Sequence, residues 1–355
     1  HCIALENVAA FYSAMGRGDE VLALVERVLA IRRETNGQEH PDTLIAMNNV
    51  VISLANAGRH DEAIGMGEEA LKLSDRVLGP EHPGALLAMN NLGVSLFDAG
   101  RRDEALTIWE DLLPKQRKVN GSNHPATLGT LQNLSTCYSK AGKFTMAVEM
   151  GEEVLELSRE VLGPEHPHTL RRIHNLAEIY SGAGQGAKAL ELHEEVFRLT
   201  GKKLGPEHPD TLAAMNSLML SYREAGRLEK SIELGEQVVA LKTKILGPEE
   251  RSTLGASTNL AGAYLMAGLL DESMTLQEET LAIKRRVLRG KDPYLSAAVQ
   301  SMAAIYKRAG RRDEALELKE EALEIRRKAF GPEHPATLAV MVSVPSSFHD
   351  AGRTA

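Results

Sequence analysis

Histidines at a fixed spacing are the first residues in this sequence with an obvious chemical potential. His40, His82, His124, His166 and His208 lie 42 residues apart, and His334 falls on the same step. Imidazole binds metal ions and titrates near neutral pH, so the series could hold zinc or sense pH. However, equivalent residues of packed helical units lie about 8–10 Å apart, whereas a Zn–N bond is about 2 Å. We therefore expect no metal site, and we expect these histidines to pack or cap the segments between helices. Sensing of pH is the alternative, and a measured titration would test it.

Asparagines form a second series with the same period. They are Asn7, Asn49, Asn91, Asn133, Asn175 and Asn259, with serine at 217, 301 and 343. Each directly precedes an apolar residue such as Leu92, and because one residue turns a helix by about 100°, the amide points off the core face. An amide both donates and accepts hydrogen bonds, so it suits contact with a peptide backbone. It could equally bond a neighbouring helix, and both roles can hold together.

Other patterns that resemble catalytic motifs fail on inspection. His193-Glu194-Glu195 begins like a zinc-peptidase motif, but Phe197 stands where a second histidine is required. The glycines between 182 and 186 lie in a predicted turn between helices, without the strand that a dinucleotide site needs. We therefore predict neither an enzyme nor a bound cofactor or metal.

Two sequence marks define the elements that carry these residues. The segment Gly-Pro-Glu-His-Pro recurs with the histidines, and glycines recur every 42 residues from Gly16 to Gly352. Met89, Leu92 and Leu96 show helical spacing in the stretch before Gly100, and acids open and bases close the stretch after it. We predict two helices per unit, A and B, with a left-handed glycine between them and Pro-X-Thr at the start of A.

Counting these marks predicts one domain over 1–355. The expected helix pairs are 1–36, 41–78, 83–120, 125–162, 167–204, 209–246, 251–288 and 293–330, followed by a lone helix at 335–351. Pro114 should kink the third B helix, and Pro345 should disturb the last A helix. The ends, at His1 and after half a unit, suggest a fragment of a larger protein.

The unit from His208-Pro-Asp-Thr-Leu to Pro248 resembles the 42-residue tetratricopeptide repeat of kinesin light chains. The resemblance covers essentially the whole chain and implies an all-α, right-handed superhelical solenoid of antiparallel helix-turn-helix repeats. It also implies that the A helices line a concave groove, where the asparagines bond a ligand's backbone. The predicted function is a scaffold that binds a protein or peptide partner. The alternative is a regulatory or self-associating array, through its terminal helices, within a larger signalling NTPase or kinase.

Composition narrows the class of partner. The net charge is -8 with both signs interspersed, so no basic stripe for nucleic acid is present. No apolar run is long enough to span a membrane, and two distant cysteines, Cys2 and Cys137, indicate a reducing, cytoplasmic location.

Charge on the predicted groove is mixed, with one local exception. Lys140, Arg171 and His174 fall in adjacent units and could form a basic spot for an acidic peptide, although a solvated face is the alternative. Tyrosines at 138, 180, 222, 264 and 306 fall on the core position of Leu96, so we expect them to pack in the core.

Overall fold

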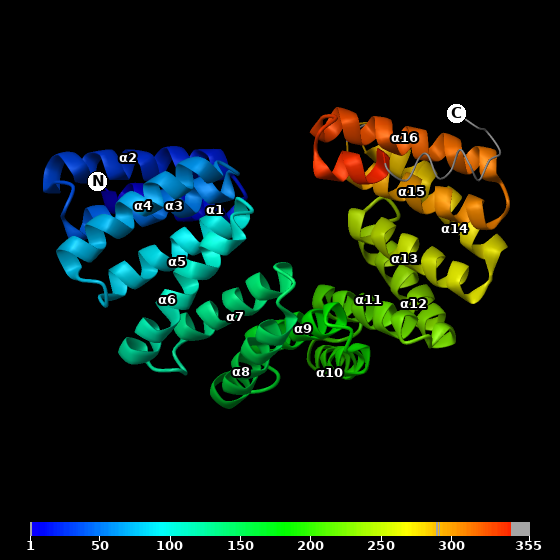
Figure 1. Ribbon diagram of the computed structural model, residues 1–355, viewed down its shortest axis with the longest axis horizontal. Coiled ribbons are helices and arrows are strands. Elements are labelled where there is room, and N and C mark those ends of the chain that lie inside the picture. Colours follow the sequence, from blue (N-terminus) through cyan, green and yellow to red (C-terminus); the bar gives the residue numbers. More distant parts are fainter. Residues whose placement is uncertain (1, 289, 291, 342–355) are drawn as a thin grey trace. The chain divides into compact units, whose positions relative to one another are not determined.

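The computed structural model describes residues 2–288, 290 and 292–341, and throughout this part of the chain every regular element is an α-helix (Figure 1). The predicted all-α class is therefore confirmed. The chain divides into two compact units, His1–Gln185 (unit 1) and Gly186–Ala355 (unit 2). The single domain over 1–355 stays a prediction, and the two units are described separately below.

Over its described residues, 2–185, unit 1 contains nine helices that alternate between A and B type. They are α1 (Cys2–Ala14), α2 (Gly18–Asn36), α3 (Pro41–Asn56), α4 (His60–Leu78), α5 (Pro83–Asp98), α6 (Arg102–Asn120), α7 (Pro125–Lys140), α8 (Phe144–Leu162) and α9 (Pro167–Gly182). Each helix packs on the next along the chain, and the A helix α3 also touches α5, as α5 touches α7 and α7 touches α9. One apolar cluster runs from Ile64 on α4 to Ile179 on α9, with Trp109 and Leu131 at its centre.

Unit 2 repeats the same arrangement. Its helices are α10 (Gly186–Leu204), α11 (Pro209–Glu224), α12 (Leu228–Leu246), α13 (Arg251–Ala267), α14 (Leu270–Val287), α15 (Pro293–Arg308) and α16 (Arg312–Phe330). A further helical segment begins at Pro335 and is described as far as Met341. The rest of the predicted helix 335–351, with Ser343 and Pro345, lies outside the described residues, and so does Gly352 after it.

The linker histidines start the A helices. In six linkers the histidine Nδ1 accepts a hydrogen bond from the backbone N–H two residues ahead, at 3.1–3.2 Å. Proline occupies the first helical turn, where a missing N–H costs nothing. The expectation that these histidines cap or pack is confirmed. Asp292 caps α15 in the same way, since its carboxylate accepts a 2.8 Å hydrogen bond from the N–H of Tyr294. Glu250 makes no side-chain cap.

Glycines and threonines shape the connections. The glycines between A and B helices have φ between +70° and +82°, a conformation that side chains with a Cβ rarely adopt, which confirms the predicted left-handed turns. In the linkers, the Thr43 hydroxyl donates to the carbonyl of Gly37 at 2.8 Å, and Thr127 and Thr337 make the equivalent bond. These bonds tie α3, α7 and the segment that begins at Pro335 to the glycine that ends the preceding B helix, whereas the hydroxyls of Thr211 and Thr253 make no such bond.

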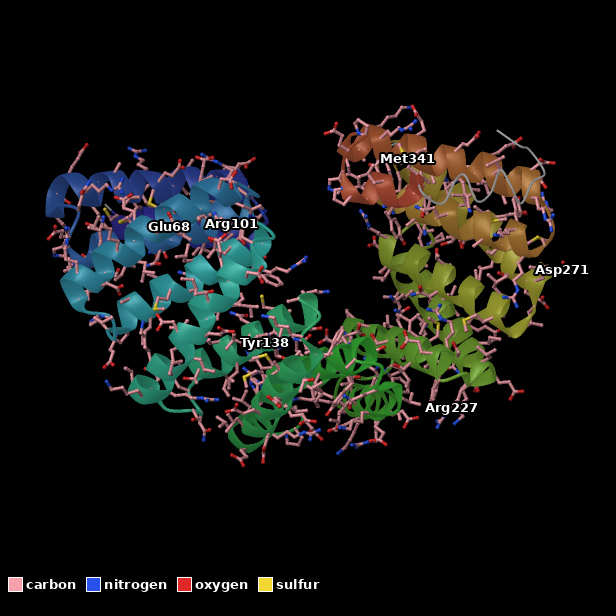
Figure 2. The ribbon with its side chains drawn as sticks, viewed as in Figure 1. Glu68, Arg101, Tyr138, Arg227, Asp271 and Met341 are labelled. Atoms are coloured by element: carbon pink, nitrogen blue, oxygen red, sulfur yellow. The ribbon has the colours of Figure 1, made fainter. Side chains whose placement is uncertain are left out.

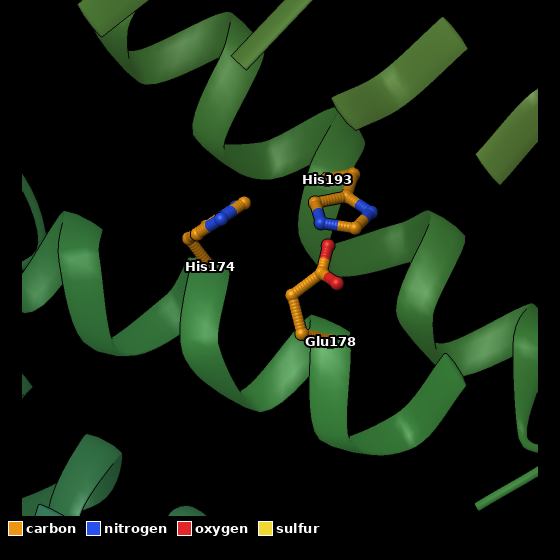
Figure 3. A group of neighbouring side chains, drawn as sticks. All are labelled: His174, Glu178 and His193. Carbon is orange, nitrogen blue, oxygen red and sulfur yellow. The ribbon is translucent and has the colours of Figure 1, made fainter. Parts of the chain in front are cut away.

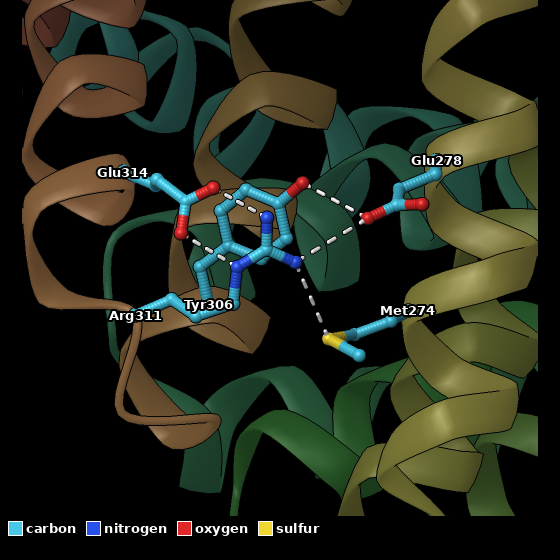
Figure 4. A network of polar contacts seen from close by, with 5 residues as sticks. All are labelled: Met274, Glu278, Tyr306, Arg311 and Glu314. Carbon is cyan, nitrogen blue, oxygen red and sulfur yellow. Dashed lines mark hydrogen bonds and ion pairs between the residues drawn. The ribbon is translucent and has the colours of Figure 1, made fainter.

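Within each unit, neighbouring repeats are also joined by tyrosine–glutamate hydrogen bonds, which we call polar rungs. Tyr138 on α7, labelled in Figure 2, is buried and donates its hydroxyl proton to Glu110 on α6 at 2.6 Å. Figure 4 shows the corresponding rung in unit 2, where Tyr306 donates to Glu278 at 2.9 Å and Arg311 stacks on the tyrosine ring at 3.9 Å. Burial and the bond to Glu110 both raise the pKa of Tyr138. The tyrosines are thus core side chains with one satisfied polar tip, although Tyr222, Tyr264 and Tyr306 are only partly buried.

Helix α6 carries two residues, Pro114 and Trp109, that the other B helices lack. It runs through Pro114 as one continuous helix, and it carries Trp109, which is 2% exposed. Room for the indole comes from Gly93 on α5, because a Cβ built there would lie 2.5 Å from Trp109 Nε1. Large and small residues are therefore matched across the α5–α6 pair.

Candidate functional site

Side chains on one exposed face of the A helices in unit 1 fall into parallel rows. The first row holds Ile45 on α3, Leu87 on α5, Gly129 on α7 and Arg171 on α9, each five residues after a linker histidine. Ile45 and Leu87 are 51% and 47% exposed, and Arg171 is also exposed. The second row, four residues further along, is the asparagine series. This surface of α3, α5, α7 and α9 is called the A face below.

Asparagines on the A face form a ladder of hydrogen bonds between neighbouring repeats. Asn91 donates from Nδ2 to Asn48 Oδ1 at 3.2 Å, and Asn133 donates to Asn90 Oδ1 at 3.3 Å. In unit 2, Asn259 makes the same bond to Asn216 at 3.3 Å. Each bond joins an asparagine to a side-chain amide of the preceding repeat. The accepting residue lies one position before the equivalent of the donor. Asn91, Asn133 and Asn259 therefore bond a neighbouring helix.

The ladder is interrupted between α7 and α9. There the accepting position holds Gln132, whose side chain instead turns along its own helix and donates to Thr136 Oγ1 at 3.3 Å. Within the described residues, the buried Oε1 of Gln132 has no hydrogen-bond partner. Asn175, which would be its donor, does not make the ladder bond. Buried polar atoms are nearly always paired, so the amide of Gln132 is incompletely paired at this gap in the ladder.

A pocket of about 750 Å³ opens at this interruption. It lies between α7 and α9, beside the end of α8. The lining residues are Asn123, Pro125, Leu128, Gly129, Gln132, Asn133 and Thr136 from the start of α7 and the linker before it, Val161 and Leu162 from α8, and His166, His168, Arg171, Arg172 and Asn175 from the start of α9 and its linker. We call it the α7–α9 pocket. The lining contains amides, two histidines and two arginines, and none of these residues is acidic. The pocket is therefore electropositive.

Arg172 differs in residue type from the equivalent positions of the other repeats. The equivalent residues of the other A helices are Ala46, Ala88, Thr130, Ala214, Ala256 and Ala298, all at most 5% exposed. The Arg172 guanidinium donates from Nη1 to Ser158 Oγ on α8. Burial, and secondarily the nearby Arg171, lower the pKa of Arg172. Within the described residues no carboxylate pairs with either arginine, so both charges remain unneutralised by the protein.

Arg171 is oriented by the start of its own helix. Its Nη2 donates to Nδ1 of His168, and that acceptor role requires a neutral imidazole. The pKa of His168 is lowered by burial first and then by Arg171 and His166, which keeps the ring neutral at pH 7. The rings of His166 and His168 stack with centroids 5.3 Å apart. The arginine is thus held at the mouth of the pocket by an uncharged partner.

Not all of the predicted site residues come together. Asn133, Asn175 and Arg171 line the α7–α9 pocket, whereas Asn91 is only 9% exposed and Asn49 is partly buried on α3. Lys140 lies in the last turn of α7, and Arg171 lies in the second turn of α9. Equivalent positions on these two A helices are eleven residues apart, which is about 16 Å along the axis. Lys140 does not line the pocket with Arg171, and the grouping of Lys140, Arg171 and His174 as a basic spot stays a prediction.

The remaining predicted residues lie elsewhere. His174 and Glu178 are one turn apart on α9 and project to the same side of it (Figure 3), but neither lines the pocket. His193, drawn in the same figure, belongs to α10 of unit 2, where its Nδ1 lies 2.6 Å from Ser221 Oγ. Asn7 is exposed on α1, and Asn259 belongs to the ladder of unit 2.

Three residues of the pocket were missed from sequence, and a signal for each was present. Gly129, Gln132 and Arg172 all depart from what their repeat position holds in neighbouring units. Among the helices that the structure describes, none is long and apolar enough to cross a membrane.

Paired antiparallel helices joined by left-handed glycines, each unit packed on the next, define an all-α solenoid of helix-turn-helix repeats. The tetratricopeptide repeat model matches residues 1–71, 45–114, 85–160, 142–200, 169–244, 250–328 and 293–354. The chain therefore belongs to the tetratricopeptide repeat family. No curated protein matches it.

Solved structures extend this comparison. The nearly identical TPR-like repeats of a Podosopora anserina protein assigned as a kinesin light chain are 36% identical, with a TM-score of 0.51, and the match covers 58% of this chain and 98% of that one. BtubC (BKLC) from P. vanneervenii is 20% identical, with a TM-score of 0.54 over 66% of this chain and 94% of the other. RapI in its apo form matches 99% of this chain and 98% of its own, with a TM-score of 0.65 at 10% identity, which is a likeness of fold alone. The kinesin-light-chain type of repeat inferred from the sequence is thus confirmed.

Proposed function

We propose that this chain is a protein-interaction scaffold that binds a peptide segment of a partner on the A face of unit 1. The observation that carries the proposal is the interrupted asparagine ladder at the α7–α9 pocket, which leaves Gln132 Oε1 and Asn175 without their usual partners. A peptide backbone supplies both N–H and C=O groups, so it can complete such a ladder. We propose no catalytic role, because the nucleophiles and bases around the pocket do not support one. The cytoplasm remains the expected location.

The test is a peptide array probed with purified wild-type protein and with the Asn133→Ala/Asn175→Ala variant. Peptides that bind the wild type should bind the variant about tenfold more weakly, because two hydrogen bonds to the ligand are lost. Asn259→Ala is the matched control. It breaks the same ladder bond in unit 2 but touches no residue of the pocket. Equal loss in both variants would show that the asparagines act only on stability, and no captured peptide at all would refute the proposal.

Self-association remains a second candidate because of one observation. Helix α1 exposes Val8 and Phe11, the latter by 63%, and Met15 in the turn that follows α1 is exposed as well. An apolar helix face of this kind suits packing against a further helix of another copy or of a larger chain. Light scattering across a concentration series separates the two candidates: a dimer that dissociates in Phe11→Ser, with peptide binding unchanged, assigns α1 to self-association and leaves the pocket to the peptide.

A further inference from the structure

Along the first row of the A face, the side chains change from apolar to cationic between one repeat and the next. It presents exposed Ile45 and Leu87 on α3 and α5, then Gly129 at the α7–α9 pocket, then Arg171 beside Arg172 on α9. Ile52, which lies two turns further along α3, is 44% exposed and widens the apolar part. In unit 2 the same row holds only small residues, Ala213, Gly255 and Ala297. The change of character is therefore specific to unit 1.

The cationic end of the row has no carboxylate partner among the residues that the structure describes. Arg171 is held by neutral His168 and Arg172 by the Ser158 hydroxyl, so two adjacent positive charges border a pocket whose lining has no acid. Guanidinium groups form their strongest hydrogen bonds with carboxylate and phosphoryl oxygens. The apolar end is likewise uncovered, since Ile45 and Leu87 are about half exposed. One ligand that satisfies both ends must carry an apolar side chain and an anionic group.

The geometry fixes how far apart these two features lie on the ligand. Leu87 and Arg171 occupy the same level on α5 and α9, which are separated by two steps between packed A helices. Each step is about 10 Å, so the two sites are about 20 Å apart. An extended chain spans about 3.3 Å per residue and covers that distance in about six residues.

We infer that the A face of unit 1 binds an extended, bipartite peptide in which an apolar side chain over Leu87 is separated by about six residues from an anionic group held by Arg171 and Arg172. This deepens the proposed peptide-binding function and rests on it. The anionic group is a carboxylate or a phosphoryl group, because both offer the oxygens that arginine binds. Between the two anchors, the backbone crosses Asn133 and the ladder gap at Gln132.

The experiment uses fluorescein-labelled peptides with a neutral glycine-serine backbone and fluorescence anisotropy with the full chain. Each peptide carries a leucine pair and a glutamate pair, separated by two, six or twelve residues. Further arms replace the glutamates by phosphoserine or by glutamine. We expect the six-residue spacing to bind at least about tenfold more tightly than the other spacings, and the glutamine arm to bind no better than background. Tighter binding of the glutamate or the phosphoserine arm assigns the carboxylate or the phosphoryl group.

Three variants test the row without endangering the fold. Arg171→Ala/Arg172→Ala gives α9 the residues that α11 already has at Ala213 and Ala214, and it should lower affinity about tenfold. Leu87→Ala should weaken the apolar end. Gly129→Leu should plug the pocket, since a Cβ there meets nothing within 4 Å.

The matched control for the plug is Gly65→Leu, a helical and exposed glycine of α4 with equally open surroundings. It should leave binding unchanged. Affinity that ignores the spacing, or that survives the double arginine change, overturns the inference. If the array yields peptides that depend on Asn133 and Asn175 but none of the bipartite set binds, the inference fails while the proposed function stands. An empty array refutes the proposed function itself.

Discussion

At the scale of single residues, the linker histidine acts as a helix cap rather than as a ligand for metal. Its Nδ1 satisfies one of the backbone N–H groups that every helix start leaves unpaired. Asp292 shows that a carboxylate can take over this role, and Glu250 shows that a side chain one methylene longer than aspartate does not. The cap therefore depends on reach, since the accepting atom must return to the N–H two residues ahead.

Replacing the cap should change stability in a graded way. His82→Ala should lower the free energy of unfolding by about 1 kcal/mol, whereas His82→Asp should be close to neutral. Glu250→Asp should raise stability by up to about 1 kcal/mol, because it installs a cap that α13 lacks. Urea unfolding followed by circular dichroism measures all three. A stabilising effect of His82→Ala, or no gain from Glu250→Asp, would contradict the capping role.

The sequence could predict where the asparagines stand but not what they contact. Their period and their place before a core leucine put them on one face of each A helix, and the structure agrees. Their hydrogen-bond partners depend on the residue one position earlier in the preceding unit, and Gln132 differs there from Asn48 and Asn90 by a single methylene. That methylene redirects the amide toward Thr136. A change so small is visible in the sequence, but its consequence is a matter of side-chain geometry.

At the scale of helices, the array tolerates different residues as long as facing volumes match. Trp109 on α6 occupies space that Gly93 on α5 leaves open. On α8 the equivalent of Trp109 is Gly151, which a Leu176 methyl group fills, since a Cβ there would lie 2.8 Å from Leu176 Cδ1. Sequence periodicity predicted the helices but could not predict this alternation, because it depends on which residue pairs meet across two elements.

Adding one methyl group at the tight contact should be costly. Gly93→Ala places its Cβ about where the indole lies, so we expect a loss of about 1–3 kcal/mol despite the better helix propensity of alanine. Trp109→Leu combined with Gly93→Ala should cost less than the sum of the two single changes, since the clash is absent. Denaturation midpoints of the four proteins provide the measurement.

Gly129→Ala is the reference for this test. It is also a glycine within an A helix, but its Cβ would meet open space, so it should be neutral or stabilising by up to about 1 kcal/mol. Equal effects of the two alanine substitutions would show that helix propensity, and not packing against Trp109, controls the response.

At the scale of the whole molecule, stability must be distributed unevenly within each unit, because a repeat gains its core from its neighbours. Helix α5 has nine buried residues and packs between α4 and α6, whereas α1 has Ala9 as its buried apolar residue among the described side chains. The polar rungs reinforce this nearest-neighbour design, since each tyrosine reaches the glutamate of the preceding unit. A stack of this kind opens from its ends.

Native-state hydrogen exchange should therefore show a gradient along unit 1. Amides of α1 should exchange through local opening that costs little free energy, and protection should rise through α3 to a maximum in α5–α7, where the apolar cluster around Trp109 and Leu131 is densest. Disrupting the cluster with Leu131→Ala should lower protection most in α5–α8 and leave α1 nearly unchanged, because α1 has already opened at lower cost. Mass spectrometry of peptic peptides resolves these helices. Uniform protection from α1 to α8, or an equal fall in all of them after Leu131→Ala, would mean that unit 1 unfolds as one cooperative block and that its stability is not a sum over neighbouring repeats.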